Sequence, residues 1–589
     1  NQEPQSGLFL RSFTQLTAVG TWIELLANIA AGYADNPYID KKSALTSLSL
    51  IVKNLLEDQR NPSLAAKGLL VNFLGLEGGK RTGPLLETIE RKRFLDTFGD
   101  NTGHAVWRAL VQKGWLLEED NGRKGRIRRT GTYGAAFFDG PLAPYAHDSL
   151  KTRIMNLLDQ RVVTIIFGDN ANLTASLAKS IGALLRPEVL HDPGIAALRE
   201  EMERFIDVQK EGYAHLFDPK TGTFFFGWDA TADRFVGWDD GRGNWITGHM
   251  NYFINEFRGP WMFAVLRYGL PEASLRNAGF KIKPYRFSDG REAYVPAAWE
   301  GSAFQLLGLS LFMQEMRNPG WSKTLETLVE VQLDFSGGKK LPGFLSEAYS
   351  GKGTEYTGTI GIPDIAVTDK PLITHAPSLY TLGVAYTIAP DKVEKFLEEH
   401  WPMISGLFTE HGPWEGWNTA GNEIIPYQTT VHTLSLILGG IGSAQENMQR
   451  YLEHRNLSWA LERLYEPGDR VNLLTAGNRF IAPSDRTISL SNGRLVLRYR
   501  SQAQVENARI SFKRAKDDPL PPPTIPIEIF VRFKPTKGKE EELQIILPAT
   551  PALKGIKEVS LSFAIQAPGN FSITAFEFIP FDVALEPAR

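Results

Sequence analysis

The spacing of hydrophobic residues changes near residue 466 of this 589-residue chain. Up to about residue 455, segments carry apolar residues at positions i, i+3, i+4 and i+7, a spacing that predicts amphipathic helices. Long connections rich in Gly, Trp and Pro separate these segments, and long connections commonly carry function or insertions. The predicted helices lie at 20–34, 43–59, 170–185, 194–209, 257–269, 324–335 and 391–401.

Paired helices in this number can form a bundle, a solenoid or a closed toroid. No fixed-period repeat is visible in the sequence, which argues against a regular solenoid. A toroid would place all the long connections around one central cleft.

From residue 466 onward the pattern is alternating or β-branched, as in RLVLRYR (494–500), IEIFVRF (527–533) and FSITAFEFI (571–579). Turn residues separate these runs at a spacing typical of a β-sandwich. We therefore predict a helical unit over 1–460 and a separate β-sandwich over 466–589. The second unit contains no Trp, which favours a structural or docking role over sugar stacking.

Composition excludes several classes of site. The chain has no Cys, so disulfides, Cys-ligated zinc and thiol nucleophiles are excluded. The formal charge is −3 with Lys and Arg spread along the chain, so nucleic acid is not an expected partner. The histidines form no HExxH motif and no GxSxG motif occurs. We predict no metal and no cofactor.

No apolar run reaches the length of a membrane span. The chain begins NQEPQSG, as it would after removal of a signal peptide or after trimming. We expect a periplasmic or secreted bacterial protein, and the absence of Cys is compatible with that expectation.

Aromatic residues are abundant, with 13 Trp and 34 Phe. Many Trp lie beside Gly or an acid, as in GWDDG, AAWEG and GPWEGW. Aromatic rings of this kind suit sugars, which have apolar faces and hydroxyl rims, although Trp also fills the cores of large proteins. The candidate stacking platforms are Trp238, Trp245, Trp299, Trp414 and Trp417.

Four acids of the helical unit lie among Gly and aromatic residues: Glu256, Glu300, Glu347 and Glu415. Glycoside hydrolysis needs two carboxyl groups, one to protonate the leaving oxygen and one to activate water or attack the sugar. Apolar neighbours raise the pKa of the acid by disfavouring its charged form. Each carboxylate also has a structural alternative. Glu256 could pair with Arg258, Glu300 could cap or bridge at the start of the helix that follows it, Glu347 could lie solvated in a loop, and Glu415 could accept from backbone amides in a tight turn.

The helical unit contains a series of short blocks in a recognisable order. They are LTAVGTWIELLANIAAG (16–32), DNANLTASL (169–177), HLFDPKTGTFFFGWDATADRF (215–235), YFINEFRGPWMFAVLRYGLP (252–271), AAWEGSAFQLLGLSLF (297–312), LPGFLSEAYSG (341–351), GTIGIPDIAVTD (358–369), HAPSLYTLGVAYTIAP (375–390) and GPWEGWNTAGN (412–422). These blocks resemble those of the glycoamylase-like glycoside hydrolases, which comprise bacterial β-1,2-glucanases, related glucoamylases and the transglycosylating domain of cyclic β-1,2-glucan synthases.

The resemblance covers roughly residues 12–455 and implies an (α/α)6 toroid. It implies a glycoside hydrolase or transglycosylase in which Glu256, Glu347 and Glu415 match the family's acids. The sequence departs from the family at Gln305, where the family has an acid, and at Pro342 and Gly343, where the family has a Trp before its "G-I-S-E". These departures leave the sugar open.

From these residues we predict a carboxylate acid/base mechanism, with inversion expected from the hydrolytic relatives. Glu347 is the predicted general acid, while Glu415 or Glu256 acts as the base or orients the sugar. The expected partner is an oligo- or polysaccharide, a bacterial glucan or a related chain. Besides the Trp platforms, the predicted substrate-binding residues are Glu300, Arg258, Tyr349 and Asp364, the last of which could equally be a turn acid.

Two other functions remain open from the sequence. A polysaccharide lyase needs a Tyr or His base beside a cation, and Tyr252, His249 and Arg258 could supply that set. A non-catalytic glycan-binding protein would use the same aromatic residues without turnover.

Overall fold

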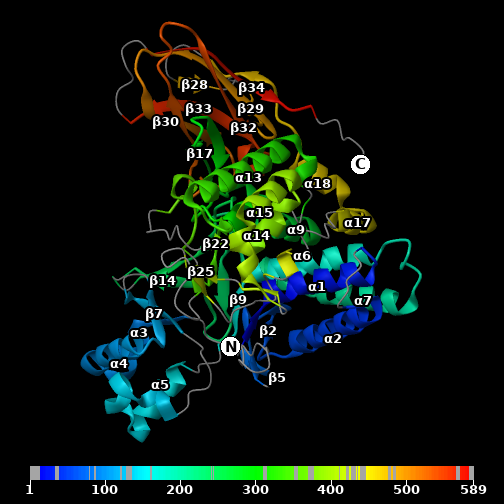
Figure 1. Ribbon diagram of the computed structural model, residues 1–589, viewed down its shortest axis with the longest axis vertical. Helices are drawn as coiled ribbons and strands as arrows, with labels where there is room; N and C mark the ends of the chain where they lie inside the picture. Colours follow the sequence, from blue (N-terminus) through cyan, green and yellow to red (C-terminus); the bar gives the residue numbers. More distant parts are fainter. Residues whose placement is uncertain are drawn as a thin grey trace.

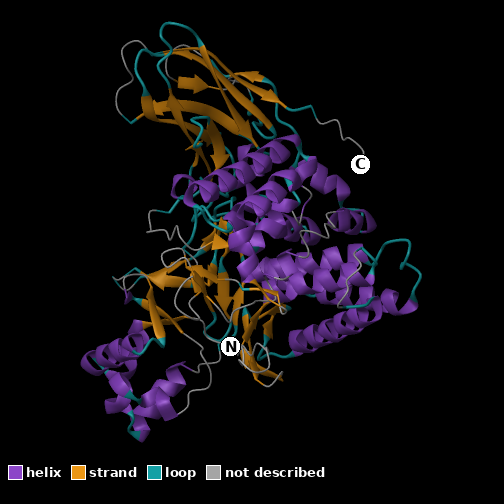
Figure 2. Cartoon of the chain, viewed as in Figure 1, coloured by secondary structure: helices purple, strands orange, loops and turns teal. Residues whose placement is uncertain are grey.

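Figures 1 and 2 show a computed structural model of the chain, in which a helical body carries two β-sheets at one end. The structure describes residues 13–33, 39–77, 80–84, 88–119, 122–127, 135–158, 162–240, 242, 244–308, 313, 315–349, 356–357, 359–368, 377–409, 412–414, 416–418, 423–425, 433, 435–437, 446–474, 479–481, 486–564 and 571–582. No helix in these ranges is long and apolar enough to cross a membrane.

One set of helices forms the interior of the body. Every residue of α6 (Phe167–Ala183) and α11 (Ala303–Leu307) is buried, as is nearly every residue of α9 (Arg258–Tyr268) and α14 (Tyr380–Tyr386). A helix that is apolar or small on all sides is expected in an interior. Small residues also allow close approach, since a Cβ added at Gly182 would lie 1.9 Å from the carbonyl oxygen of Asn447.

A second set of helices covers this interior and buries one face only. In α2 the buried apolar residues recur at helical spacing, for example Ala44, Leu48 and Val52, and the carboxylate of Asp40 caps the helix by accepting from the Ser43 amide at 2.7 Å. Helix α1 packs on α2 and α6, α6 on α7, α11 on α13 and α14 on α15. The bounds are α1 (Leu16–Ala30), α2 (Lys41–Arg60), α7 (Pro193–Asp207), α13 (Pro319–Lys339), α15 (Pro390–Ile404), α17 (Glu446–His454) and α18 (Ser458–Leu464). The seven predicted helices are confirmed as α1, α2, α6, α7, α9, α13 and α15.

The C-terminal region contains two sheets. One has six strands in the order β18-β17-β31-β30-β33-β28, and the other has four in the order β27-β34-β29-β32. The bounds are β17 (Phe280–Arg286), β18 (Glu292–Pro296), β27 (Val471–Asn472), β28 (Arg479–Ile481), β29 (Gly493–Arg500), β30 (Val505–Arg514), β31 (Ile527–Phe533), β32 (Glu541–Leu547), β33 (Ile556–Phe563) and β34 (Ser572–Pro580).

The sequence predicted a separate C-terminal unit, but the six-stranded sheet is shared with the helical body. The hairpin β17–β18 comes from the body, and β17 pairs in parallel with β31 through Phe280 and Ile527. The Trp321 indole of α13 also donates to the Ala549 carbonyl at 2.8 Å. The body therefore supplies two strands that the C-terminal sheet needs for completion.

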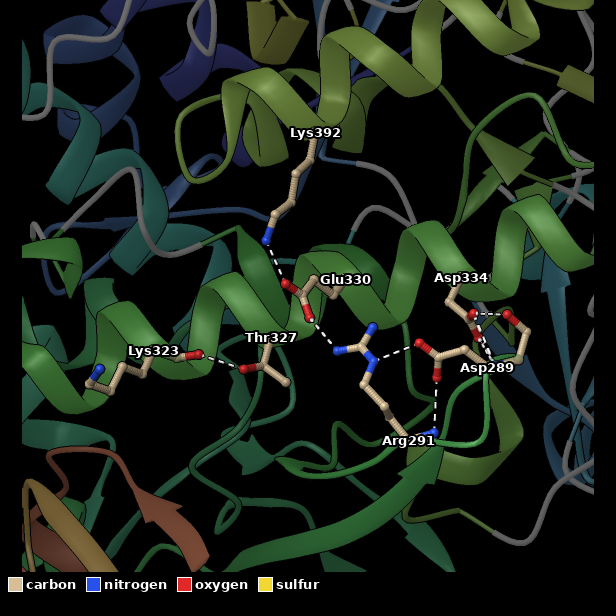
Figure 3. A network of polar contacts seen from close by, with 8 residues as sticks. Asp289, Arg291, Lys323, Thr327, Glu330, Asp334 and Lys392 are labelled. Carbon is tan, nitrogen blue, oxygen red and sulfur yellow. Dashed lines mark hydrogen bonds and ion pairs between the residues drawn. The ribbon is translucent and has the colours of Figure 1, made fainter.

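An exposed polar network fastens the same hairpin to the helices (Figure 3). The carboxylate of Glu330 on α13 pairs with Lys392 of α15 at 2.5 Å and with Arg291 of the hairpin at 3.8 Å. The Ser288 hydroxyl donates to Asp334 at 2.5 Å. Exposed ion pairs of this kind contribute about 0–1 kcal/mol each, so they orient the hairpin more than they stabilise it.

Residues 88–158 form a small unit that the sequence analysis did not predict as distinct from the helical body. Its own hydrophobic core includes Phe94, Trp107 and Ile154. Figure 1 shows it at the opposite end of the molecule from the C-terminal sheets. It contains β6 (Thr88–Glu90), α3 (Arg91–Phe98), α4 (Asp100–Gln112), β7 (Leu116–Glu119), β8 (Lys124–Ile127) and α5 (Asp148–Leu158).

We predict that a fragment of residues 466–589 does not fold alone. Without β17, the backbone groups of β31 lose a ladder partner, and the apolar side chains of Ile527 and Ile529 lose their cover. Circular dichroism and gel filtration of the fragment should show an unfolded or aggregated chain. A soluble monomer with a cooperative thermal transition would contradict the shared sheet.

Candidate active site

Three of the candidate carboxylates lie at the N-terminal ends of buried helices. Asp169 is the third residue of α6, Glu256 precedes α9 by two residues, and Glu300 precedes α11 by three. Asp169 thus lies in the first turn of its helix, while Glu256 and Glu300 lie on the short segments that lead into theirs. A helix N-terminus presents unpaired amides and a partial positive charge, which favours carboxylates there.

Gln305 on α11 joins two of the predicted acids. Its side-chain amide donates to Glu300 Oε2 at 2.5 Å and to Glu347 Oε1 at 3.4 Å, and its Oε1 accepts from the Glu300 backbone amide at 3.1 Å. The side-chain amide nitrogen has two N–H groups and can donate to two carboxylates at once, whereas a carboxyl group in its place has at most one O–H donor. Gln305 therefore holds Glu300 and Glu347 close together.

The backbone around Glu347 is fixed by hydroxyl groups. The Ser346 hydroxyl lies 3.0 Å from that of Ser302 and 2.8 Å from that of Tyr380, which donates to the Glu347 carbonyl at 3.0 Å. Ser302, Ser346 and Tyr380 are buried. This network ties Glu347, which lies between β19 (Phe344–Leu345) and β20 (Ala348–Tyr349), to both α11 and α14.

The pKa of Glu256 is raised well above the ordinary value of 4.5. Burial of the carboxyl group is the main cause, and the negative charges of Glu347, Glu300 and Asp169 add to it. The Asp169 carboxylate is itself held by the side chains of Gln15 at 2.8 Å and Thr17 at 2.6 Å. Four carboxyl groups thus act on one another at one place.

Sequence reasoning missed Asp169 as a member of this cluster. The residue opens the block DNANLTASL, so the family resemblance already marked its position. The local sequence does not show that Asp169 belongs to a cluster, because segments distant along the chain meet only after folding.

Glu415 lies outside the described residues, as does the side chain of Tyr349. The strand that follows Glu415, β25 (Gly416–Asn418), lies against β20 and against β22 (Pro377–Ser378). Strand β25 therefore approaches the segment that carries Glu347.

The predicted Trp platforms fall into different settings. Trp299, beside Glu300, is 39% exposed and contacts Tyr252 edge-to-face at 5.7 Å. Trp238 on β14 (Gly237–Asp239) is 46% exposed. By contrast, Trp417 is buried in the core, and Trp414 is half-buried. Exposure thus leaves Trp299 and Trp238 as the better placed sugar contacts.

Hydrogen bonds connect the Trp238 region to the start of α6. The Phe167 amide donates to the Phe226 carbonyl, and the Phe226 amide donates to Gly248, each at 2.9 Å or less. The space above Gly248 is bounded by the Trp238 ring at 3.7 Å. A chain of contacts through Gly248 and Phe226 therefore links Trp238 to Phe167, two residues before Asp169. Trp245 on the paired strand β15 (Trp245–Thr247) stacks under Arg234 at 3.6 Å.

Arg258 was predicted to grip substrate, and its placement assigns it a structural role instead. The guanidinium forms a double hydrogen bond to Glu315 at 2.9 and 2.8 Å, and neither side chain is exposed. It also lies 4.2 Å from the centre of the Trp321 ring. The sequence alternative of a Glu256–Arg258 pair is replaced by this Arg258–Glu315 pair.

Asp364 is exposed on the short helix η5 (Pro363–Ile365). The preceding Ile362 amide donates to the Gly301 carbonyl at 3.1 Å, so this segment packs beside Glu300. A turn acid, the second of the two sequence readings, fits this placement.

The three residues of the lyase alternative have separate partners. The Tyr252 hydroxyl donates to the Ala297 carbonyl at 2.5 Å, and burial raises its pKa. His249 lies 3.0 Å from Asp218, and Arg258 is paired with Glu315. The structure does not bring these three side chains together as a base and a cation. Among the described residues, no group of three His, Asp or Glu could hold a metal ion.

Comparison with solved structures identifies the fold. The chain is similar to the endo-β-1,2-glucanase of Talaromyces funiculosus in complexes with β-1,2-glucan and with sophorose, each at 13% identity and TM-score 0.53, over 78% of this chain and 80% and 81% of the other. An endo-β-1,2-glucanase of Chitinophaga pinensis aligns at 11% identity and TM-score 0.47, over 78% and 88%. No family sequence model and no curated protein matches the chain. The chain thus has the fold of the Talaromyces enzyme, as the sequence blocks predicted.

We predict that Arg258→Met lowers the free energy of unfolding by about 3–5 kcal/mol, because it leaves Glu315 charged, buried and unpaired. Urea denaturation measures the change. Arg291→Met is the matched control, since this Arg is 65% exposed in its ion pairs and its loss should cost about 1 kcal/mol or less. Equal losses in the two variants would contradict the structural role of Arg258.

Proposed function

We propose that this chain is a glycoside hydrolase that cleaves a β-glucan by carboxylate acid/base catalysis. The observation that carries the proposal is the carboxyl cluster in which burial and three neighbouring negative charges raise the pKa of Glu256. Cleavage of a glycosidic bond requires one carboxyl group with a raised pKa, which can donate a proton, and a second that acts as base or nucleophile.

Glu256 is the proton donor in this mechanism. The leaving sugar departs as an alkoxide unless its oxygen receives a proton, and Glu256 holds a proton where an ordinary glutamate would have lost it. This assignment exchanges the roles expected from the sequence, where Glu347 was the general acid. The reason for the exchange is the set of charges around Glu256, which local sequence does not reveal.

Glu347 is the ionised partner. Its carboxylate accepts from Gln305, and its backbone is fixed by Tyr380 and Ser346. In an inverting reaction it would take a proton from the water that attacks the anomeric carbon. Glu415, which the family resemblance also marks as an acid, is the second candidate for this base.

The proposed architecture is an (α/α)6 toroid with a C-terminal β-sandwich. In the described part of the chain, α1–α2, α6–α7, α11–α13 and α14–α15 each pair a buried helix with a helix buried on one face, and this alternation supports the toroid. The first substrate to test is β-1,2-glucan, because the Talaromyces enzyme of the same fold is solved with that glucan.

We expect Glu256→Gln and Glu347→Gln each to lower kcat about 10²–10⁴-fold, the usual contribution of an acid or base. Release of reducing ends from β-1,2-glucan and from other linkage-defined glucans measures the loss, and NMR of the first product anomer tests inversion. Glu415→Gln, assayed beside them, decides between the two candidate bases. Asp289→Asn, an exposed acid of the Figure 3 network, is the control and should keep full activity.

Full activity in Glu256→Gln would refute the assigned proton donor. Binding of glucans without turnover of any would favour the non-catalytic alternative. Products that absorb as unsaturated uronides would instead show a lyase.

The raised pKa also predicts how stability depends on pH. Between the ordinary value of 4.5 and the raised pKa of folded Glu256, the folded chain binds more protons at this site than the unfolded chain. The free energy of unfolding therefore falls as pH rises through this window, and Glu256→Gln removes that fall. We expect the free energy of unfolding of Glu256→Gln to exceed that of the wild type at pH 8, with the difference shrinking toward pH 4. Urea denaturation at both pH values tests this, and a constant difference would contradict it.

A further inference from the structure

Two aromatic side chains at the C-terminal end of α15 are exposed and touch each other. Trp401 is 51% exposed and Phe408, on β23 (Phe408–Thr409), is 48% exposed. Their ring centres lie 5.9 Å apart with the planes at 36°. Large aromatic side chains normally gain stability by burial, so two adjacent rings left in water form a surface suited to an apolar partner.

This aromatic pair is joined to the candidate active site by the chain that follows it. Phe408 on β23 pairs with Pro413 on β24 (Gly412–Pro413), and the Trp414 amide donates to the Leu407 carbonyl at 2.7 Å. The chain then enters β25, which lies against β20, the strand directly after Glu347.

A second connection runs through the interior. Phe396, five residues before Trp401 on α15, contacts Phe344 at 6.0 Å between ring centres. Phe344 belongs to β19, three residues before Glu347. The helix that presents Trp401 and the strand that leads to Glu347 are thus packed on each other.

The chemistry around the pair favours an uncharged partner. Glu398 and Glu399 precede Trp401, and Glu399 pairs with Lys395 at 3.8 Å, while the last turn of α15 contains no Lys or Arg. An anionic chain would be repelled here. A neutral sugar ring offers an apolar C–H face to each aromatic ring and hydroxyl groups to water.

We propose that Trp401 and Phe408 form a distal subsite that binds a neutral glucan chain beyond the sugars held at the carboxyl cluster. This inference rests on the proposed function for its substrate, and it concerns two residues that the sequence analysis did not select. The distal subsite contributes binding along the chain and takes no part in bond cleavage.

The test compares Trp401→Ala and Phe408→Ala with Trp459→Ala on long and short β-1,2-glucans. Trp459 is the matched control, because it is 63% exposed but lies on α18, outside the segments that lead to Glu347. We expect the first two variants to raise KM for long chains about tenfold with kcat unchanged, since they remove uniform binding. Short oligosaccharides, which do not reach the distal subsite, should be cleaved as by the wild type.

A second readout does not depend on turnover. Glu256→Gln, alone and combined with Trp401→Ala or Trp459→Ala, is run in native gels that contain long β-1,2-glucan or other neutral glucans. The distal subsite predicts that glucan retards the single variant, and that Trp401→Ala weakens this retardation while Trp459→Ala does not. Thermal melting of every variant confirms that the fold is intact.

The outcomes separate the two proposals. If the wild type cleaves no glucan but Trp401→Ala still loses retardation, the hydrolase assignment fails and the distal subsite stands. If Trp401→Ala behaves as Trp459→Ala does, or if long and short chains lose activity equally, the distal subsite is refuted. Absence of retardation by every neutral glucan would refute it as well.

Discussion

Electrostatic repulsion among carboxyl groups is the constraint on which the rest of this structure depends. Asp169, Glu300 and Glu347 come from separate segments of the chain, yet the charges of all three act on the carboxyl group of Glu256. Such a cluster opposes folding, because bringing like charges out of water costs free energy. Contacts with other parts of the fold must therefore offset this repulsion.

Support comes from three kinds of contact. Helix N-termini present partial positive charge to the acids that begin or precede them. Neutral donors bind the carboxylates directly, as Gln305 does for Glu300 and Glu347 and Thr17 does for Asp169. Further away, the buried Arg258–Glu315 pair and the hairpin β17–β18 fix the body and join it to the C-terminal sheets.

The sequence predicted those features that depend on local pattern. Helical spacing located α1, α2, α6, α7, α9, α13 and α15, and the aromatic, Gly-rich setting selected Glu256, Glu300 and Glu347. It could not predict pairings between distant segments. Arg258 meets Glu315 57 residues away, and β17 meets β31 more than two hundred residues away, so neither partner is visible in a short window. The sequence predicted Glu347 as the general acid, and the proposal gives that role to Glu256, because a pKa depends on charges that only the fold brings together.

Gln305 is one of the positions at which this sequence departs from the family pattern. Where the family resemblance has an acid, an acid here would add a further negative charge next to Glu300 and Glu347. The amide instead donates to both, so two carboxylates that repel each other share one neutral donor. Under the proposed chemistry the proton of the cluster remains on Glu256, whose pKa is raised by burial of its carboxyl group and by the charges of Glu347 and Glu300. Under this proposal, the departure from the family pattern at Gln305 helps to determine which carboxyl group holds the proton.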